Sequence, residues 1–382
     1  MAKQAYVYSG TEWVPLASEV TNLSAYQTKA LNQFPNRNLI INGAMQVAQR
    51  NTSVASITSS GYRTVDRFTF NPSSMGTWTM SQESDGPTGS GFAKSTKILC
   101  TTADASPAAS DEVWIGQRFE GQNLQHIKKG TASAEQLTAS FWVKSNVTGT
   151  YIVELVDQDA AYRTVSKSYT INTSGVWEYK TLTFPADTTG VLDNDNGLSM
   201  YIQWWLGAGS TYTSGTLGTT WTTLTSANRA VGQVNLASAT NNYWQITGVQ
   251  LEVGDTATPF EFLSAETELI KCQRYYEKSY LDNIAPGTVS DGYVFNGMGT
   301  HSGQKCMYGT KWIVRKRTNP TWTVYDRAGN SGKITILDSG GTGTDNQTLA
   351  LASSDYNGWN YLGSSNGTYS GFKFNWVADA EL

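Results

Sequence analysis

The sequence predicts an all-β protein: a large antiparallel jelly-roll-like sandwich, one linking α-helix, a smaller C-terminal β-sandwich, and a short N-terminal hairpin and helix. Two observations support this prediction. Short runs of alternating apolar and polar residues recur at close intervals, and clusters of Gly, Asn, Asp and Ser separate them. Aromatic residues make up 12% of the chain and charged residues only 15%, which is typical of a β-rich protein with a weakly charged surface.

The length and charge of the chain set further limits. Its 382 residues are enough for two or three domains, and the formal net charge of −4 argues against nucleic acid as a partner. One basic cluster, of Lys311, Arg315, Lys316 and Arg317, is interpreted as a solvated strand face. No run of about 18 apolar residues and no signal peptide is evident, so we expect synthesis in a cytoplasm and no membrane insertion.

The N-terminal segment, residues 1–37, combines a hairpin predicted over residues 2–13 with a weak helix. The residues along one face of this helix are spaced alternately four and three apart, which is the spacing of a coiled coil. The seam consists of Leu16, Val20, Leu23, Gln27, Ala30 and Phe34. Two interpretations stay open, because so short a seam fits either a single helix packed on the first domain or an inter-subunit contact that sets the oligomeric state.

Residues 38–262 form the predicted jelly roll. The runs 137–143, 151–155 and 198–206 each place alternate apolar residues on one face, as half-buried strands do. Turn signals separate these runs, and no helical pattern lies between them. We therefore expect consecutive antiparallel strands that pack as two sheets.

The join between the two sandwiches is predicted as a strand, a turn and a helix. The apolar phase of the strand slips by one residue at Gly248, which suggests a β-bulge. The linking helix is predicted over residues 263–281, with Ser264 as its cap. Its apolar face consists of Leu269, Cys272 and Tyr276. We expect this join to act as a hinge or spacer.

Residues 282–382 form the predicted second sandwich. Its strands are expected over residues 311–314, 322–325, 334–337, 348–351 and 372–378. In the last of these, alternate residues from Phe372 to Ala378 line one face, which predicts a strand against a core.

Several long runs resemble a known family. The runs are Asn38 to Arg50, Asp66 to Phe68, Trp244 to Gly254, Ala257 to Glu261 and Glu268 to Tyr276. In this order they resemble the opening and the closing join of a module found in many bacteriophage tail fibre proteins, and they bracket residues 38–276. The resemblance implies a homotrimer in the virion, attached to phage tail or adaptor proteins through residues 1–37. It also implies that loops of the C-terminal sandwich contact host surface polysaccharide or protein.

No catalytic residue is assigned from the sequence. Asp157 with Asp159, and Asp193 with Asp195, are the carboxylate pairs that glycoside hydrolysis would need, but a strand end and a turn account for them. The run Asp193–Gly197 departs from a calcium loop, because its Gly stands at the fifth position and no Glu closes it. The three cysteines and two histidines lack ligand spacing. We therefore expect no enzymatic activity, no metal and no cofactor.

Glycan binding requires fewer specific residues than catalysis, since an exposed aromatic ring beside amide and hydroxyl groups suffices. A polar loop predicted in the C-terminal sandwich holds such a set. The candidate ligand-binding residues there are Tyr356, Trp359, Asn360, Tyr361 and Tyr369, with core or inter-subunit packing as their alternative role. In the large sandwich, Trp204 and Trp205 must point to opposite faces, so Trp205 is a weaker candidate for a sheet-face site or a subunit contact.

These features favour a non-enzymatic tail fibre protein that mediates attachment to the host cell through surface glycan. Loops on a rigid sheet scaffold are where such specificity usually lies. The alternatives are a tail-associated polysaccharide depolymerase and a glycan-binding module without a virion role.

Overall fold

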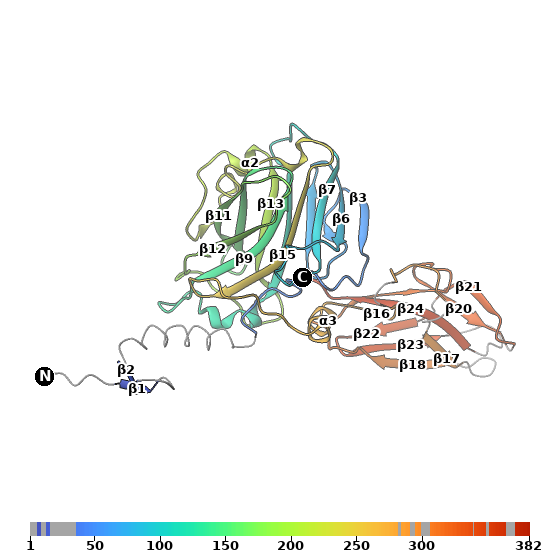
Figure 1. Ribbon diagram of the computed structural model, residues 1–382. Helices are drawn as coiled ribbons and strands as arrows, with labels where there is room; N and C mark the ends of the chain where they lie inside the picture. Colours follow the sequence, from blue (N-terminus) through green and yellow to red (C-terminus); the bar gives the residue numbers. More distant parts are fainter. Residues whose placement is uncertain are drawn as a thin grey trace.

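The computed structural model of the chain is nearly all β, as predicted (Figure 1). It describes residues 6–8, 13–15, 36–281, 284–290, 295–298, 306–338, 340–348, 351–363 and 371–382. A large sandwich and a smaller one lie side by side, with helix α3 (Ala265–Gln273) between them. Strands β1 (Tyr6–Tyr8) and β2 (Trp13–Pro15) pair as the predicted N-terminal hairpin. The proposed seam, Leu16 to Phe34, lies outside the described residues.

Two antiparallel sheets form the large sandwich. One has, in spatial order, β14 (Thr222–Thr223), β11 (Arg163–Ile171), β10 (Gly149–Asp157), β13 (Leu198–Ala208), β8 (Glu112–Glu120), β5 (Thr69–Ser73) and β4 (Gly61–Tyr62). The other has β12 (Glu178–Phe184), β9 (Leu137–Ser145), β15 (Tyr243–Val253), β7 (Ser95–Thr102), β6 (Thr77–Glu83) and β3 (Ser53–Ile57). Short helical turns connect them at η1 (Gly121–Asn123), η2 (Gln125–Ile127), α2 (Ser210–Thr213), η3 (Ser226–Asn228) and η4 (Leu236–Ser238).

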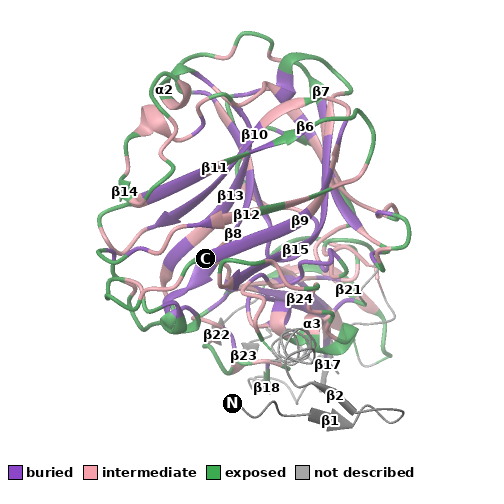
Figure 2. Cartoon of the chain, turned by 60° about the vertical axis from the view of Figure 1, so that its left-hand side comes forward, coloured by how far each residue is buried: buried purple, intermediate pink, exposed green. Residues whose placement is uncertain are grey.

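The core of the large sandwich lies between its two sheets, where the strands are mostly buried (Figure 2). In β9, Leu137, Ala139, Phe141 and Val143 all join this core, as their alternation predicts. The edge of the Phe141 ring meets Trp204 of the facing sheet, with ring centroids 5.7 Å apart. Alternate side chains of β9 thus point into the space between the two sheets.

The predicted bulge in β15 is confirmed. The register of β15 against β9 shifts between Thr247 and Gln250, and Gly248 between them has φ 61°. A Cβ atom at Gly248 would also lie 2.6 Å from the Phe92 ring. Both the left-handed backbone and the close ring require glycine here.

The linking helix begins as predicted and ends early. The Ser264 side chain accepts a hydrogen bond from the Thr267 backbone N–H, which caps α3. The prediction that the helix continues to residue 281 is wrong, because β16 (Tyr276–Lys278) is a strand. This strand pairs with the last strand of the chain, so long-range pairing overrides the local helical period.

The C-terminal sandwich also has two sheets. The larger contains β16, β24 (Gly371–Asp379), β20 (Lys333–Leu337) and β21 (Gly343–Thr348), with β17 (Phe295–Met298) and β19 (Thr321–Tyr325) also paired to β24. The smaller contains β18 (Cys306–Lys311), β23 (Gly358–Gly363) and β22 (Leu351–Ser354). In β24, alternate residues from Phe372 to Ala378 join the core, as predicted.

Two strand predictions in this sandwich are wrong at their boundaries. The run 311–314 is not a strand, because β18 ends at Lys311 and a loop follows. The run 348–351 spans the end of β21 and the start of β22. The apolar residues 312–314 mimic a strand, but the strand has already ended at Lys311.

The end of the chain holds the two sandwiches together. After β24, residues 380–382 continue onto the large sandwich, where the C-terminus lies (Figure 1). Arg67 forms a buried ion pair with Glu381. An Nη of Arg50 lies 3.0 Å from Asp379 and 3.4 Å from Glu381. These contacts join residues more than 300 positions apart and fix one sandwich against the other.

The runs that resemble the tail fibre module meet at the same junction. The Gly43 carbonyl accepts a 2.9 Å hydrogen bond from the Val249 backbone, and a Cβ on Gly43 would collide with Val249. The Gln49 side chain donates to the Tyr276 carbonyl at 2.8 Å and also to Asp66. A hinge or spacer was expected here, and these contacts link the join to both sandwiches.

Candidate functional site

The predicted ligand-binding residues fall in one strand and one turn. Tyr356 lies in the turn between β22 and β23, where the Asp355 side chain accepts hydrogen bonds from the Asn357 and Gly358 backbones. Tyr356 is 41% exposed. The prediction of one long polar loop is wrong, because residues 359–361 form part of β23 and pair with both β18 and β22. Tyr369 lies outside the described residues.

Trp205 does not lie on an open sheet face. Its indole is fully buried, and its Nε1 donates a 3.1 Å hydrogen bond to Glu154. Tyr212 of α2 packs against the ring, and Arg229 lies 5.0 Å from its centroid. Trp204 and Trp205 do point to opposite faces, but the segment after β13 folds back and covers the second one.

The Tyr356 turn is attached to the loop that follows β18. The Lys316 backbone N–H donates to the Tyr356 carbonyl at 2.9 Å, and the Trp312 indole donates to the Asp355 carbonyl at 2.8 Å. The Arg315 guanidinium lies over the Tyr356 ring, 4.5 Å from its centroid. This cation–π contact presents an aromatic ring and a cation together at the surface.

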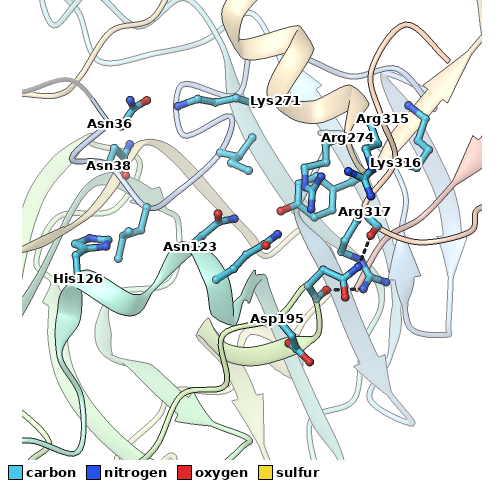
Figure 3. Close-up of a pocket in the computed structure, with 15 residues that line it drawn as sticks. Asn36, Asn38, Asn123, His126, Asp195, Lys271, Arg274, Arg315, Lys316 and Arg317 are labelled. Atoms are coloured by element: carbon cyan, nitrogen blue, oxygen red, sulfur yellow. Dashed lines mark hydrogen bonds between the residues drawn. The ribbon is translucent and has the colours of Figure 1, made fainter. Parts of the chain in front are cut away.

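Arg315 also lines a cleft of about 660 Å³ at the junction (Figure 3). The cleft is built from five segments: residues 36–41, 122–126 and 195–196 of the large sandwich, residues 271–275 at the end of helix α3, and residues 315–317 of the loop that contains Arg315. Lys271, Arg274 and Arg315 lie along one side of it, and Asn123, His126 and Asp195 lie along the other (Figure 3). Segments far apart in the sequence thus form one polar cleft.

Two cations at the cleft are neutralised by buried glutamates. Arg274 forms a bidentate pair with Glu120, at 2.8 and 2.6 Å, and Lys316 pairs with Glu277. Burial alone raises the pKa of Glu120, but hydrogen bonds from Arg274 and Tyr275 outweigh this and hold that pKa below its ordinary value. Glu120 therefore stays ionised and structural.

The carboxylates named from the sequence do not face each other across a groove. Asp157 is buried and pairs with Lys129, which also lies 2.7 Å from Asp187. The Asp159 side chain accepts a hydrogen bond from the Asp193 backbone at 2.9 Å. Asp195 caps its own turn by accepting from the Gly197 backbone at 2.7 Å. These aspartates shape turns and one buried ion cluster.

The interpretation of the basic cluster as a solvated strand face is wrong for its last two members, Lys316 and Arg317. Lys316 is 1% exposed, and Arg317 donates to the carbonyls of Ala380, Glu381 and Asn196. Sequence reasoning missed the cleft because no local pattern joins these residues to Lys271. The cluster itself was the available signal, since cations at such spacing in a chain with little charge need partners.

Among the described residues, no group of His, Cys, Asp and Glu is arranged to hold a metal ion. In the same part of the chain, no helix is long and apolar enough to cross a membrane. No protein-family model matches the sequence, and no curated protein does.

Several solved structures are similar in part. The enzymatically active domain of tailspike protein 4 of bacteriophage CBA120 has 13% identity and a TM-score of 0.31, covering 58% of this chain, which spans only 22% of the tailspike chain. A putative sugar binding protein from Bacteroides thetaiotaomicron has 12% identity and a TM-score of 0.33, covering 56% of this chain and 99% of its own. A family 22 carbohydrate binding module from Clostridium thermocellum has 12% identity and a TM-score of 0.27, covering 55% and 98%. With TM-scores this low, the functional argument rests on the residues of this chain.

Proposed function

We propose that this protein is a non-enzymatic bacteriophage tail fibre protein that attaches the virion to glycan on the host surface. The observation that carries this proposal is the exposed Tyr356 ring under Arg315, at the rim of a polar cleft. Sugars present apolar C–H faces and hydroxyl rims, so an aromatic ring beside amides and cations suits them. The role in the virion is supported by the sequence runs between Asn38 and Tyr276 that resemble tail fibre proteins.

The carboxylates at the cleft support the proposal of binding without cleavage. Hydrolysis of a glycosidic bond needs two carboxyl groups, one of which holds a proton. Among the described residues that line the cleft, Asp195 is the one carboxylate. Glu120 lies behind Arg274 as its ion-pair partner, and its lowered pKa keeps it ionised, so that it holds no proton to donate to a leaving group. Host polysaccharide incubated with the protein should therefore keep its chain length, whereas shortened chains would indicate a depolymerase.

The assembly belongs to the same proposal. Residues 1–37 would dock on tail or adaptor proteins and bring three chains together. A trimer presents three weak glycan sites at once, and avidity then compensates for low single-site affinity.

Adsorption of the full-length protein to host cells tests the proposal. Tyr356→Ala removes an exposed ring, so folding should be kept while cell binding weakens roughly tenfold. Tyr179→Ala is the matched control, because Tyr179 is 46% exposed but lies on β12, in the large sandwich. Labelled protein is titrated onto cells, and virus adsorption is measured in competition. Equal losses in both variants, or no adsorption by the wild type, would refute this site.

A further inference from the structure

Two cations of the cleft, Lys271 and Arg315, form no ion pair among the described residues, although the charge of Lys271 acts on the nearby Glu268 carboxylate. Arg274 and Lys316 have glutamate partners, but among the described residues no carboxylate lies within ion-pair distance of Lys271 or Arg315. Arg317 donates only to backbone carbonyls. Desolvation lowers the pKa of His126 below its ordinary value, so this ring is neutral at pH 7 and adds hydrogen-bonding capacity without charge. The cleft therefore has a positive surplus in a chain whose net charge is −4.

The remaining wall supplies neutral polar groups and one carboxylate, Asp195, which accepts a hydrogen bond from the Gly197 backbone. Asn123 lies at the end of η1, on the side of the cleft opposite Lys271 (Figure 3). Asn196 already donates to the Arg317 carbonyl, and this contact holds the two sandwiches at a set separation at the edge of the cleft. The spacing between the cationic and amide walls is thus fixed by the protein before any ligand arrives. A preformed site of this kind avoids the cost of ordering its walls on binding.

From this geometry we infer that the cleft binds an anionic saccharide, whose carboxylate or phosphate groups contact Lys271 and Arg315 at separate points of its wall (Figure 3). The inference rests on the glycan attachment proposed above and adds the chemical class of the glycan. Charge-assisted hydrogen bonds from lysine and arginine are the usual means of holding such groups. Tyr356, under Arg315, would stack on the sugar ring next to the charged one.

Titrations with two pairs of probes test this class in the full-length protein. Hexagalacturonate carries carboxylates, and its methyl ester has the same skeleton without charge. Mannose 6-phosphate and mannose form the corresponding phosphate pair. We expect an acidic probe to bind, its neutral partner to bind far more weakly, and the affinity to fall as salt is raised.

The double variant Lys271→Gln/Arg315→Gln should bind the acidic probe roughly tenfold more weakly or worse. Its matched control is Lys94→Gln/Arg63→Gln, which removes a lysine and an arginine whose side chains hydrogen-bond serines outside the cleft.

Binding of one acidic probe alone supports the inference and identifies the group. Equal binding of acid and neutral partner, acid binding that survives the double variant, or no acid binding overturns it. If host cells still adsorb the protein in a Tyr356-dependent way, attachment stands and the glycan is neutral; without any adsorption the proposed function itself fails.

Discussion

The two sides of the junction use the same kinds of side chain in opposite ways. On the inner side, Arg67 is buried and Arg50 is partly buried, and the two arginines meet Asp379 and Glu381 directly. On the open side, Lys271 and Arg315 face the cleft, and no carboxylate of the described chain lies within ion-pair distance of either. Each arginine of the inner side has a carboxylate partner, whereas in the described chain neither cation of the open side has one within ion-pair distance.

The difference follows from the medium around each charge. A buried guanidinium without a partner is strongly unfavourable, so the inner side can form only when the end of the chain supplies its carboxylates. A cation at an open cleft keeps water around it and needs no protein partner. The inner side therefore assembles the two sandwiches, and the open side is available for a ligand.

Removing Arg67 should have the largest effect on stability. Arg67→Ala leaves Glu381 buried without its closest partner and removes the guanidinium 3.4 Å from the Tyr275 ring centroid. We expect the free energy of unfolding to fall by about 3–5 kcal/mol. Denaturant unfolding of the full-length protein, followed by tryptophan fluorescence, measures the loss.

The control for Arg67 is a nearby arginine outside the junction. Arg63 donates to Ser59 and Ser60 at the surface, so Arg63→Ala should lower the free energy of unfolding by less than about 1 kcal/mol. Similar losses in the two variants would show that the inner ion pairs do not hold the sandwiches together.

The fold was predictable from the sequence to the extent that it depends on local patterns. Burial of one sheet face imposes alternation, so strands such as β9 and β24 were found. The bulge at Gly248 and the cap at Ser264 were found because each depends on one or two residues. The helix end was missed because residues 276–278 leave the helical period to pair with β24.

The candidate site was predictable only in part. Tyr356 was found because an aromatic residue stood in a polar turn. The cleft was missed because Asn123, Lys271 and Arg315 meet only through the packing of the two sandwiches. Trp205 was misplaced for a similar reason: strand alternation gives its face correctly but says nothing of the segment that covers it.

Acid should weaken the junction through Glu120, an effect of intermediate size. The folded-state pKa of Glu120 lies below its ordinary value because Arg274 and Tyr275 bond its carboxylate. Its contribution to the free energy of unfolding is therefore full above the unfolded pKa, about 4.5, and is lost as the pH falls through the lower folded value. Unfolding curves of wild type and Glu120→Gln should differ by roughly 1–3 kcal/mol at pH 7 and converge in acid.

A second substitution separates this effect from general acid denaturation. Glu135 forms an exposed pair with Lys128, so Glu135→Gln should leave the pH dependence of stability close to that of the wild type. If the free energy of unfolding of Glu120→Gln falls with pH in parallel with that of the wild type, Glu120 does not account for the loss of stability in acid.

The smallest effect on stability is expected from the cations that matter most for binding. Lys271→Gln/Arg315→Gln removes two positive charges, as many as Arg50 and Arg67 carry together, but neither meets a protein carboxylate in the described chain. We expect the free energy of unfolding to change by less than about 0.5 kcal/mol, because only the contact of Arg315 with the Tyr356 ring is lost. Thermal and denaturant unfolding of this variant beside Arg67→Ala measures the contrast. A loss as large as that of Arg67→Ala would mean that the open side also holds the sandwiches together, and its cations would then be structural.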